Sequence, residues 1–278
     1  MNPLGSLDVR GGPPRISSWQ VSTTIGEYAT LPGLSRRAGR EALRAVLDHL
    51  FPWFCVSCTG PSRRALCDPC LATVRWIGDP SCPSCGLPLA TPPSHLCSRC
   101  AAEPPAFGRL RAIACYRIDD EDHDPIGRAL RALKYERRRA LAGSLSAILA
   151  EHFPFSPEEF DCIAPVPLHV SRLRERGFNQ ALLLARDPAR RCGRRIDAML
   201  LERVRRTSPQ VGLGLAERRK NLRGAFRVRE GRDVAGVRVL VVDDVSTSGA
   251  TADACATALI EAGARSVDVV ALARTLPH

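Results

Sequence analysis

The sequence predicts an α/β fold in which a parallel sheet is flanked by helices, preceded by a small cysteine-rich domain. Two apolar runs, "VRVLVV" (237–242) and "SVDVVALA" (266–273), enclose a stretch of helical periodicity that ends at Gly263. From residue 237 to residue 273 this unit spans 37 residues, the size of one βαβ unit. Ahead of it, four C-x-x-C pairs fall between residues 55 and 100.

The other elements of the α/β part follow the same periodicities. A nearly continuous apolar run such as 237–242 is typical of a strand that is covered on both faces. Ligands bind beyond the carboxyl ends of such strands, and Asp243 and Asp244 fall at that place. Further strands are expected over 111–118 and 161–167, and helices over 126–133, 141–149 and 178–186.

The paired cysteines predict metal binding rather than disulfides. The chain has no secretory pattern, and two C-x-x-C turns can close a tetrahedral four-thiolate site that suits zinc. Loops of eight, eleven and eleven residues between the pairs fit two zinc ribbons in tandem. We expect structural Zn²⁺, one or two ions with two favoured, because a closed site leaves no position for chemistry. The expected ligands are Cys55, Cys58, Cys67, Cys70, Cys82, Cys85, Cys97 and Cys100.

The spacing leaves open which cysteine pairs share an ion. Neighbouring pairs are favoured, and an interleaved arrangement also fits. The remaining cysteines are expected to be small core residues or bystanders rather than metal ligands; they are Cys115, Cys162, Cys192 and Cys255.

We predict three segments along the chain. Residues 1–38 are rich in Gly, Pro, Ser and Thr without periodicity and are expected to be a disordered extension. Residues 39–105 are expected to hold a helix with an apolar stripe over 43–51 followed by the double ribbon, and residues 106–278 the α/β domain. No run is apolar and long enough to cross a membrane, so we expect a cytoplasmic protein with no membrane insertion.

Positive charge is concentrated in one region. The formal net charge is +11, and only Lys134 and Lys220 among the 40 basic residues are lysines. From Ser171 to Arg232 there are 18 Arg and Lys against 6 Asp and Glu, a net +12. Such a region suits a polyanion, either a phosphorylated small molecule or a nucleic acid. A solvated helical surface is the alternative explanation.

The segment "LVVDDVSTSGAT" (240–251) combines the features of a sugar-phosphate site. Asp243 and Asp244 offer acceptors for ribose hydroxyls or for a magnesium-bound water. The loop that follows leads into a helix N-terminus, which favours a phosphate, and Gly249 allows close backbone approach. The alternative is a capped helix after a solvated acidic pair. The hydroxyl donors of the loop are Thr247, Ser248 and Thr251.

These residues resemble the phosphoribosyl diphosphate (PRPP) signature of type I phosphoribosyltransferases. The resemblance implies a type I phosphoribosyltransferase-like sheet, in which Asp243 and Asp244 bind the ribose hydroxyls with Mg²⁺. It also implies that the 5-phosphate binds at Thr247, Ser248, Gly249, Ala250 and Thr251.

Further blocks resemble the ComF family of amidophosphoribosyltransferase-like competence proteins. They are "ALKYERRRAL" (132–141), "APVPLHVSRLRERGFNQALLLAR" (164–186) and "QVGLGLAERRKNLRGAF" (210–226), together with the cysteine array. This resemblance covers roughly residues 45–275. It implies that Leu168, His169 and Arg172 form the diphosphate loop, and that about 206–221 form a flexible hood over the substrate. Val170 and Ser171 stand where a proline is more typical.

Three functions follow from the residues and the resemblance together. The first is transfer of the phosphoribosyl group to an acceptor with release of diphosphate, for which the sequence singles out no catalytic general base. The second is PRPP binding or sensing without turnover. The third is single-stranded DNA binding as an accessory of DNA uptake, with a competence helicase or another uptake protein as partner. The ribbon is poor in aromatic residues for base stacking, and only Trp53, Phe54 and Trp76 are available at its edges.

Overall fold

The structure is a computed structural model that describes residues 54–90, 96–117, 124–206, 217 and 221–276. The predicted extension 1–38 and the predicted helix 43–51 lie outside the described residues, as do 207–216 and 218–220 of the predicted hood. Among the described residues, no helix combines the length and the apolar character needed to cross a bilayer.

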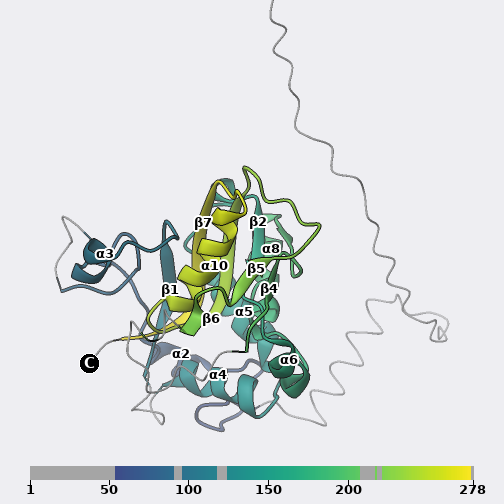
Figure 1. Cartoon of the computed structure of the whole chain (residues 1–278). Coiled ribbons are helices and arrows are strands. Elements are labelled where there is room, and N and C mark those ends of the chain that lie inside the picture. Colours follow the sequence, from purple (N-terminus) through teal and green to yellow (C-terminus); the bar gives the residue numbers. More distant parts are fainter. Residues whose placement is uncertain (1–53, 91–95, 118–123, 207–216, 218–220, 277–278) are drawn as a thin grey trace, which may run out of the picture. The chain divides into compact units, whose positions relative to one another are not determined.

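A five-stranded parallel sheet forms the centre of the α/β part, in the order β1-β7-β6-β2-β3 (Figure 1). Every neighbouring pair in this sheet is parallel, as the βαβ pattern predicts. The predicted sheet is therefore confirmed. Its strands are β1 (Leu110–Tyr116), β2 (Cys162–Pro165), β3 (Arg195–Ile196), β6 (Arg238–Ser246) and β7 (Ser266–Thr275).

Strand β6 is longer than the apolar run that predicts it. The prediction ends the strand at Val242, but β6 continues to Ser246, whose Cα partner is Arg274 of β7. The reason is that β7 itself runs to Thr275 and supplies backbone partners beyond the apolar residues. Asp243 and Asp244 therefore lie within the strand rather than in the loop that follows it.

Helices cover both faces of the sheet. Val239 and Val241 of β6 pack in the core on the side of α10, whereas Leu240 and Val242 pack in the core that includes α4 and α5. This alternation explains the continuous apolar run. The helices are α4 (Pro125–Tyr135), α5 (Leu141–Glu151), α6 (Val170–Arg176), α7 (Gln180–Leu184), α8 (Arg186–Cys192) and α10 (Ala250–Glu261), with a 3₁₀ turn η2 (Pro157–Glu159).

A separate two-stranded antiparallel sheet flanks the predicted hood. Strand β4 (Leu201–Arg203) pairs with β5 (Phe226–Val228), so the intervening chain leaves and returns at one place. The side chain of Arg205, just after β4, joins the two ends of this segment by donating hydrogen bonds to the backbone oxygens of Asn221 (3.0 Å) and Arg223 (2.6 Å).

The eight paired cysteines gather into two groups of four. In each group the four sulfur atoms lie within 4.8 Å of one another, and each group joins neighbouring C-x-x-C pairs. The favoured pairing is confirmed and the interleaved arrangement is excluded. A four-sulfur donor set at this separation fits a tetrahedral zinc ion. The first group is Cys55, Cys58, Cys67 and Cys70, beside α2 (Asp68–Ala72); the second is Cys82, Cys85, Cys97 and Cys100, beside α3 (Ser98–Ala102).

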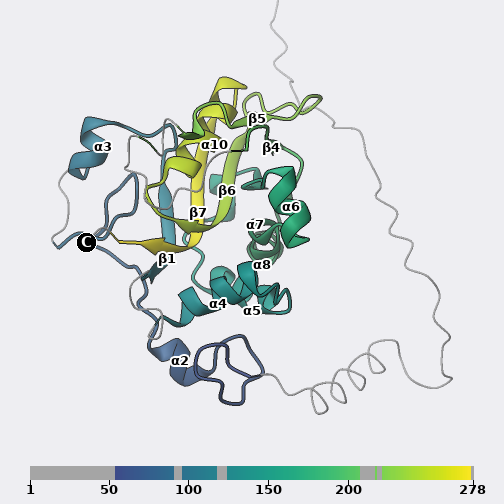
Figure 2. The same ribbon diagram turned by 60° about the horizontal axis from the view of Figure 1, so that its bottom comes forward.

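The two ribbons join different cores of the α/β part. Residues of the first ribbon, including Leu66, belong to the core formed with α4 and α5, and Figure 2 shows α2 beside these helices. Residues of the second ribbon, including Cys85 and Cys100, belong to the core that α10 covers. The predicted division between residues 105 and 106 stays a prediction.

The thiols within each group differ in acidity. Burial acts to raise the pKa of Cys55, but hydrogen bonds from the backbone of Cys58 and Cys67 lower it to about 6. Burial and the neighbouring thiols raise the pKa of Cys70 to about 12. The second group repeats the division, with a pKa of about 6 at Cys82 and about 12 at Cys100. Metal binding must therefore displace protons from the less acidic thiols.

We predict two zinc ions per chain, one from each four-cysteine group. Because protons compete for the same thiols, zinc should be lost to a chelator faster as the pH falls from about 7 to about 5. Elemental analysis and a colorimetric zinc-release assay measure the two quantities. A content of one ion per chain would contradict the expected pair of sites.

Candidate functional site

The predicted acidic pair is buried at the carboxyl end of β6. Asp243 is 8% exposed and Asp244 is 4% exposed. The alternative of a solvated acidic pair therefore does not describe this structure. Because successive side chains of a strand point to opposite faces, the two neighbouring carboxylates meet different elements.

Asp244 is held by cationic and amide donors from the helical layer that contains α4 and α7. The ammonium of Lys134 on α4 forms an ion pair with Oδ2 of Asp244, and Gln180 Nε2 donates a hydrogen bond to Oδ1 at 3.1 Å. Arg176 continues the network by donating to Gln180 Oε1 at 2.7 Å. Burial acts to raise the pKa of Asp244, but Lys134 holds it below its ordinary value. Asp244 is therefore the ionised member of the pair.

The pKa of Asp243 is shifted in the opposite direction from that of Asp244. Its Oδ1 accepts a hydrogen bond from the backbone N–H of Asp244 at 2.8 Å. Burial, followed by the charge of Asp244, raises the pKa of Asp243 well above its ordinary value. Asp243 also interacts electrostatically with Cys255 on α10 and with Arg203 on β4. The pair thus favours one negative charge and one proton, which a cation could displace.

Sequence reasoning assigned no role to Lys134. Its amine is nearly buried, with 17% of the side chain exposed. Burial acts to lower its pKa, but Asp244 and then Asp243 keep the pKa above its ordinary value. Two signals could have found it: it is one of two lysines among 40 basic residues, and it follows buried Leu130 by one helical turn on the apolar face of α4. A charge at such a position needs a buried partner.

The predicted phosphate loop runs from β6 into the N-terminus of α10. Gly249 is the N-cap, with a φ of 80°, a conformation that side chains other than glycine rarely adopt. The backbone N–H of Ala250 donates to Ser248 Oγ at 3.4 Å. Thr247 and Thr251 are half-buried at either side of this turn. The loop therefore has hydroxyl groups, a glycine turn and the positive end of a 12-residue helix, all of which suit a phosphate.

The predicted diphosphate residues divide between a loop and a helix. Leu168 and His169 are half-buried and follow β2, which pairs with β6 beside the acidic residues. His169 is the N-cap of α6, and its Nδ1 accepts from the backbone N–H of Ser171 at 3.3 Å. Arg172 is exposed and lies in the first turn of α6 rather than in the loop. The pairing of β2 with β6 therefore brings Leu168 and His169 to the same edge of the sheet as Asp243 and Asp244, whereas Arg172 lies on helix α6.

Two neutral side chains hold this edge in place. Asn179 caps α7 and donates to the backbone oxygen of Val166 at 3.0 Å, which fastens the start of the predicted diphosphate loop. Gln180, the next residue, supports Asp244 directly.

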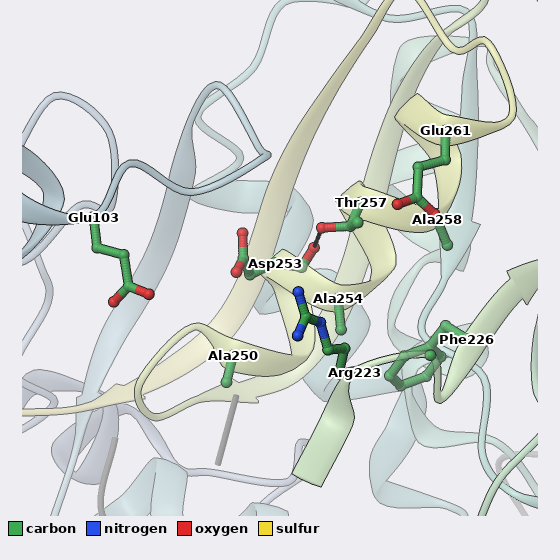
Figure 3. Close-up of a pocket in the computed structure, with 10 residues that line it drawn as sticks. Glu103, Arg223, Phe226, Ala250, Asp253, Ala254, Thr257, Ala258 and Glu261 are labelled. Atoms are coloured by element: carbon green, nitrogen blue, oxygen red, sulfur yellow. Dashed lines mark hydrogen bonds between the residues drawn. The ribbon is translucent and has the colours of Figure 1, made fainter. Parts of the chain in front are cut away.

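A separate cavity of about 700 Å³ runs along α10 (Figure 3). The acidic side chains of Glu103, Asp253 and Glu261 line it together with Arg223, and Asp243 and Asp244 do not. Only Ala250, at the start of α10, belongs both to this cavity and to the predicted phosphate loop. The cavity is therefore a neighbour of the acidic pair and not its binding pocket.

The donor atoms of each centre fit a different metal. The sulfur groups suit zinc, as described above. The two carboxylates offer hard oxygen ligands, which suit magnesium when it arrives with a phosphorylated substrate. Lys134 already occupies Oδ2 of Asp244, so the remaining oxygens of the pair are the ones that could hold such an ion.

Comparison with known proteins agrees with the cysteine pattern and with the blocks in the α/β part. The double zinc ribbon domain family matches residues 46–101. The DNA utilization protein YhgH of Salmonella typhimurium is 34% identical over 229 residues, which cover 81% of this chain and 96% of that protein. The protein of the same name from Escherichia coli K12 is 34% identical over 230 residues, with the same coverage.

Competence protein F of Haemophilus influenzae is 28% identical over 238 residues, which cover 81% of this chain and 99% of that protein. A protein of solved structure from Thermus thermophilus shares 18% identity over 49% of this chain and 84% of its own, with a TM-score of 0.29 that is too low to support a comparison of folds. The similarity to the curated proteins extends over both the ribbons and the sheet. The chain therefore belongs to the ComF family, with the DNA utilization protein YhgH and competence protein F as relatives.

Proposed function

We propose that this protein binds PRPP together with Mg²⁺ at the carboxyl end of β6 and transfers its phosphoribosyl group to an acceptor, with release of diphosphate. One observation carries the proposal: two adjacent buried carboxylates lie near the carboxyl end of a parallel strand, and this strand leads through a short loop into a helix N-terminus of the kind that binds phosphate. A buried acidic pair costs stability, so its presence at a ligand-binding edge favours a functional role.

Each part of PRPP has a counterpart in the site. Asp243 and Asp244 accept hydrogen bonds from the ribose hydroxyls, and Lys134 keeps Asp244 ionised for that purpose. Thr247, Ser248, Gly249, Ala250 and Thr251 receive the 5-phosphate at the start of α10. The loop at Leu168 and His169, with Arg172 on α6, faces the diphosphate.

The transfer replaces one bond at C1 of the ribose. The bond from C1 to the diphosphate oxygen breaks as the acceptor forms a new bond to C1, and diphosphate leaves with the electron pair. Negative charge then grows on the leaving group, where His169 and Arg172 supply donors. Magnesium, when bound, neutralises part of that charge. The buried carboxylates fix the ribose so that C1 stays exposed to the acceptor.

Single-stranded DNA binding is a second candidate function. Two of the relatives bear names that refer to DNA utilization or competence. In this chain, α6 presents exposed Arg172 and Arg174 within the region of net charge +12. Exposed arginines of this kind suit a phosphate backbone. This function and PRPP binding share Arg172 and otherwise use different residues, so one chain can carry both.

Calorimetric titration of Mg²⁺ and PRPP tests the primary proposal. The double variant Asp243→Asn/Asp244→Asn keeps the shape of both side chains and removes the charge. We expect its affinity to fall by about 100-fold or more, as the loss of two charge-assisted hydrogen bonds of roughly 1.5–3 kcal/mol each predicts. Zinc content should stay unchanged.

The matched control for this titration is Glu230→Gln/Glu261→Gln. It likewise replaces two carboxylates by amides, at exposed positions away from the acidic pair. Unchanged PRPP binding is expected. Equal affinity of the wild type and the Asp243/Asp244 variant would refute the site.

Replacing Lys134 tests whether it keeps Asp244 ionised. In Lys134→Met the effect of burial on Asp244 loses its largest opposing contribution, so the pKa of Asp244 rises and PRPP binding should require a higher pH than in the wild type. The unpaired buried carboxylate should also lower the free energy of unfolding by about 3–5 kcal/mol. Calorimetry across pH and chemical denaturation measure these effects.

Two variants serve as controls for Lys134→Met. Arg139→Met removes an exposed cation just after α4 and should change neither quantity. Adding Asp244→Asn to Lys134→Met should restore stability but not PRPP affinity. A wild-type pH profile in Lys134→Met would refute the role of the lysine.

Salt dependence separates the two candidate functions. Single-stranded DNA binding should weaken steeply between about 50 and 200 mM salt and should not need Mg²⁺. Arg174→Gln, which leaves the predicted diphosphate residue Arg172 in place, should reduce DNA affinity and its salt slope. DNA affinity that is insensitive to both changes would exclude α6 as the DNA surface.

A further inference from the structure

The second ribbon lies directly against the predicted phosphate loop. Arg99 and Cys100 of α3 line a small cavity together with Ser248 and Gly249. Phe107 lines the same cavity, and a Cβ placed on Gly249 would lie 3.8 Å from its ring.

The segment after α3 adds a direct bond to α10. The backbone N–H of Ala106 donates to Asp253 Oδ1 at 2.7 Å. The loop that would hold the 5-phosphate is therefore supported from one side by the second ribbon and by the chain that follows it.

A buried arginine joins the same ribbon to the end of the sheet. Arg274 of β7 is 1% exposed, and its guanidinium donates a hydrogen bond to the backbone oxygen of Cys85. Its Nε has no hydrogen-bond partner among the described residues, and within that part of the chain Arg274 forms no ion pair with a carboxylate. Ser246, its Cα partner on β6, stands three residues before Gly249.

A buried cation without a carboxylate needs another source of negative charge. An uncompensated buried charge costs several kcal/mol. Four cysteine thiolates around one Zn²⁺ carry a net charge of −2, and the second group lies beside Arg274. The arginine and the cysteine group therefore compensate each other's charge.

The first cysteine group has different surroundings. Its ribbon is fastened to α5 by a hydrogen bond from the backbone N–H of Ala65 to Ser144 Oγ at 3.0 Å. It belongs to the core on the α4 and α5 side of the sheet, whereas Gly249 and Ala250 begin the helix on the other side. The two groups should therefore differ in their effect on the phosphate loop.

We propose that Arg274 is the buried counter-charge of the second four-cysteine group, and that it is a positioning residue through which metal occupancy of that group supports the phosphate loop. The counter-charge role stands on the contacts of Arg274 alone. Only the effect on ligand binding rests on the proposed PRPP function.

Differential alkylation of the full zinc-loaded chain in the presence of a chelator tests the counter-charge role. In Arg274→Met the cysteines from 82 to 100 should react about tenfold faster or more, as is usual when a group that supports a metal ligand is lost. The cysteines from 55 to 70 should react at the wild-type rate, and Arg274→Lys should fall between the two. Mass spectrometry of the two peptides reads each group separately.

The control variant is Arg194→Met. Arg194 also donates hydrogen bonds to a backbone oxygen, that of Pro157 at 2.9 and 2.7 Å, but it lies away from both cysteine groups. Neither group should respond to this variant. Equal reactivity of the two groups in Arg274→Met, whether slow or fast, would overturn the proposal, because the role requires a selective loss.

PRPP titration tests the link to the phosphate loop. Cys97→Ser/Cys100→Ser should lower PRPP affinity about tenfold or more, whereas the matched variant Cys67→Ser/Cys70→Ser should keep it. An equal effect of both variants would overturn the link. A wild-type chain that binds no PRPP would refute the proposed function and this link, and the alkylation rates would still decide the role of Arg274.

Discussion

Two neighbouring carboxylates on one β-strand are the constraint around which this molecule is arranged. Their side chains must point to opposite faces of the sheet, and both faces are covered. Asp244 therefore needs a cation from the α4 layer, and Lys134 provides it. Among the described residues Asp243 forms no ion pair, and its burial beside Asp244 favours the protonated form. The result is a pair with unlike charge states, held by a strand that β7 extends beyond the apolar core.

Much of the architecture could be predicted because periodicity and spacing are local properties of the chain. The run 237–242 predicts a strand covered on both faces, and the C-x-x-C spacing predicts two tetrahedral sites. The limits of the prediction are equally physical. Apolar periodicity could not predict that β6 would continue to Ser246, because that depends on the length of a partner strand. It could not predict helix α6 either, whose residues are all partly or fully exposed.

The charged partners of the site were harder to predict for another reason. Lys134 meets Asp244 across 110 positions of the sequence (244 minus 134), and Arg274 meets Cys85 across 189. Such contacts depend on the complete fold. Composition still marks such residues once the fold is known. A lone lysine on an apolar helix face and an arginine in a buried strand both require a compensating group. Buried charges are thus the positions where sequence reading most needs a structure.

The placement of the two ribbons has a consequence for how the chain folds during synthesis. The ribbons emerge from the ribosome early, yet each finishes its packing against elements made later. The edge strand β1 pairs with β7, and Arg109 beside it reaches Asp268, 159 positions downstream. The contact order is therefore high, and such topologies fold slowly. Until β7 is translated, the zinc ribbons of a nascent chain would be only partly covered by the rest of the fold. The protection of their cysteines from oxidation would then depend on the rate of translation as well as on the affinity for zinc.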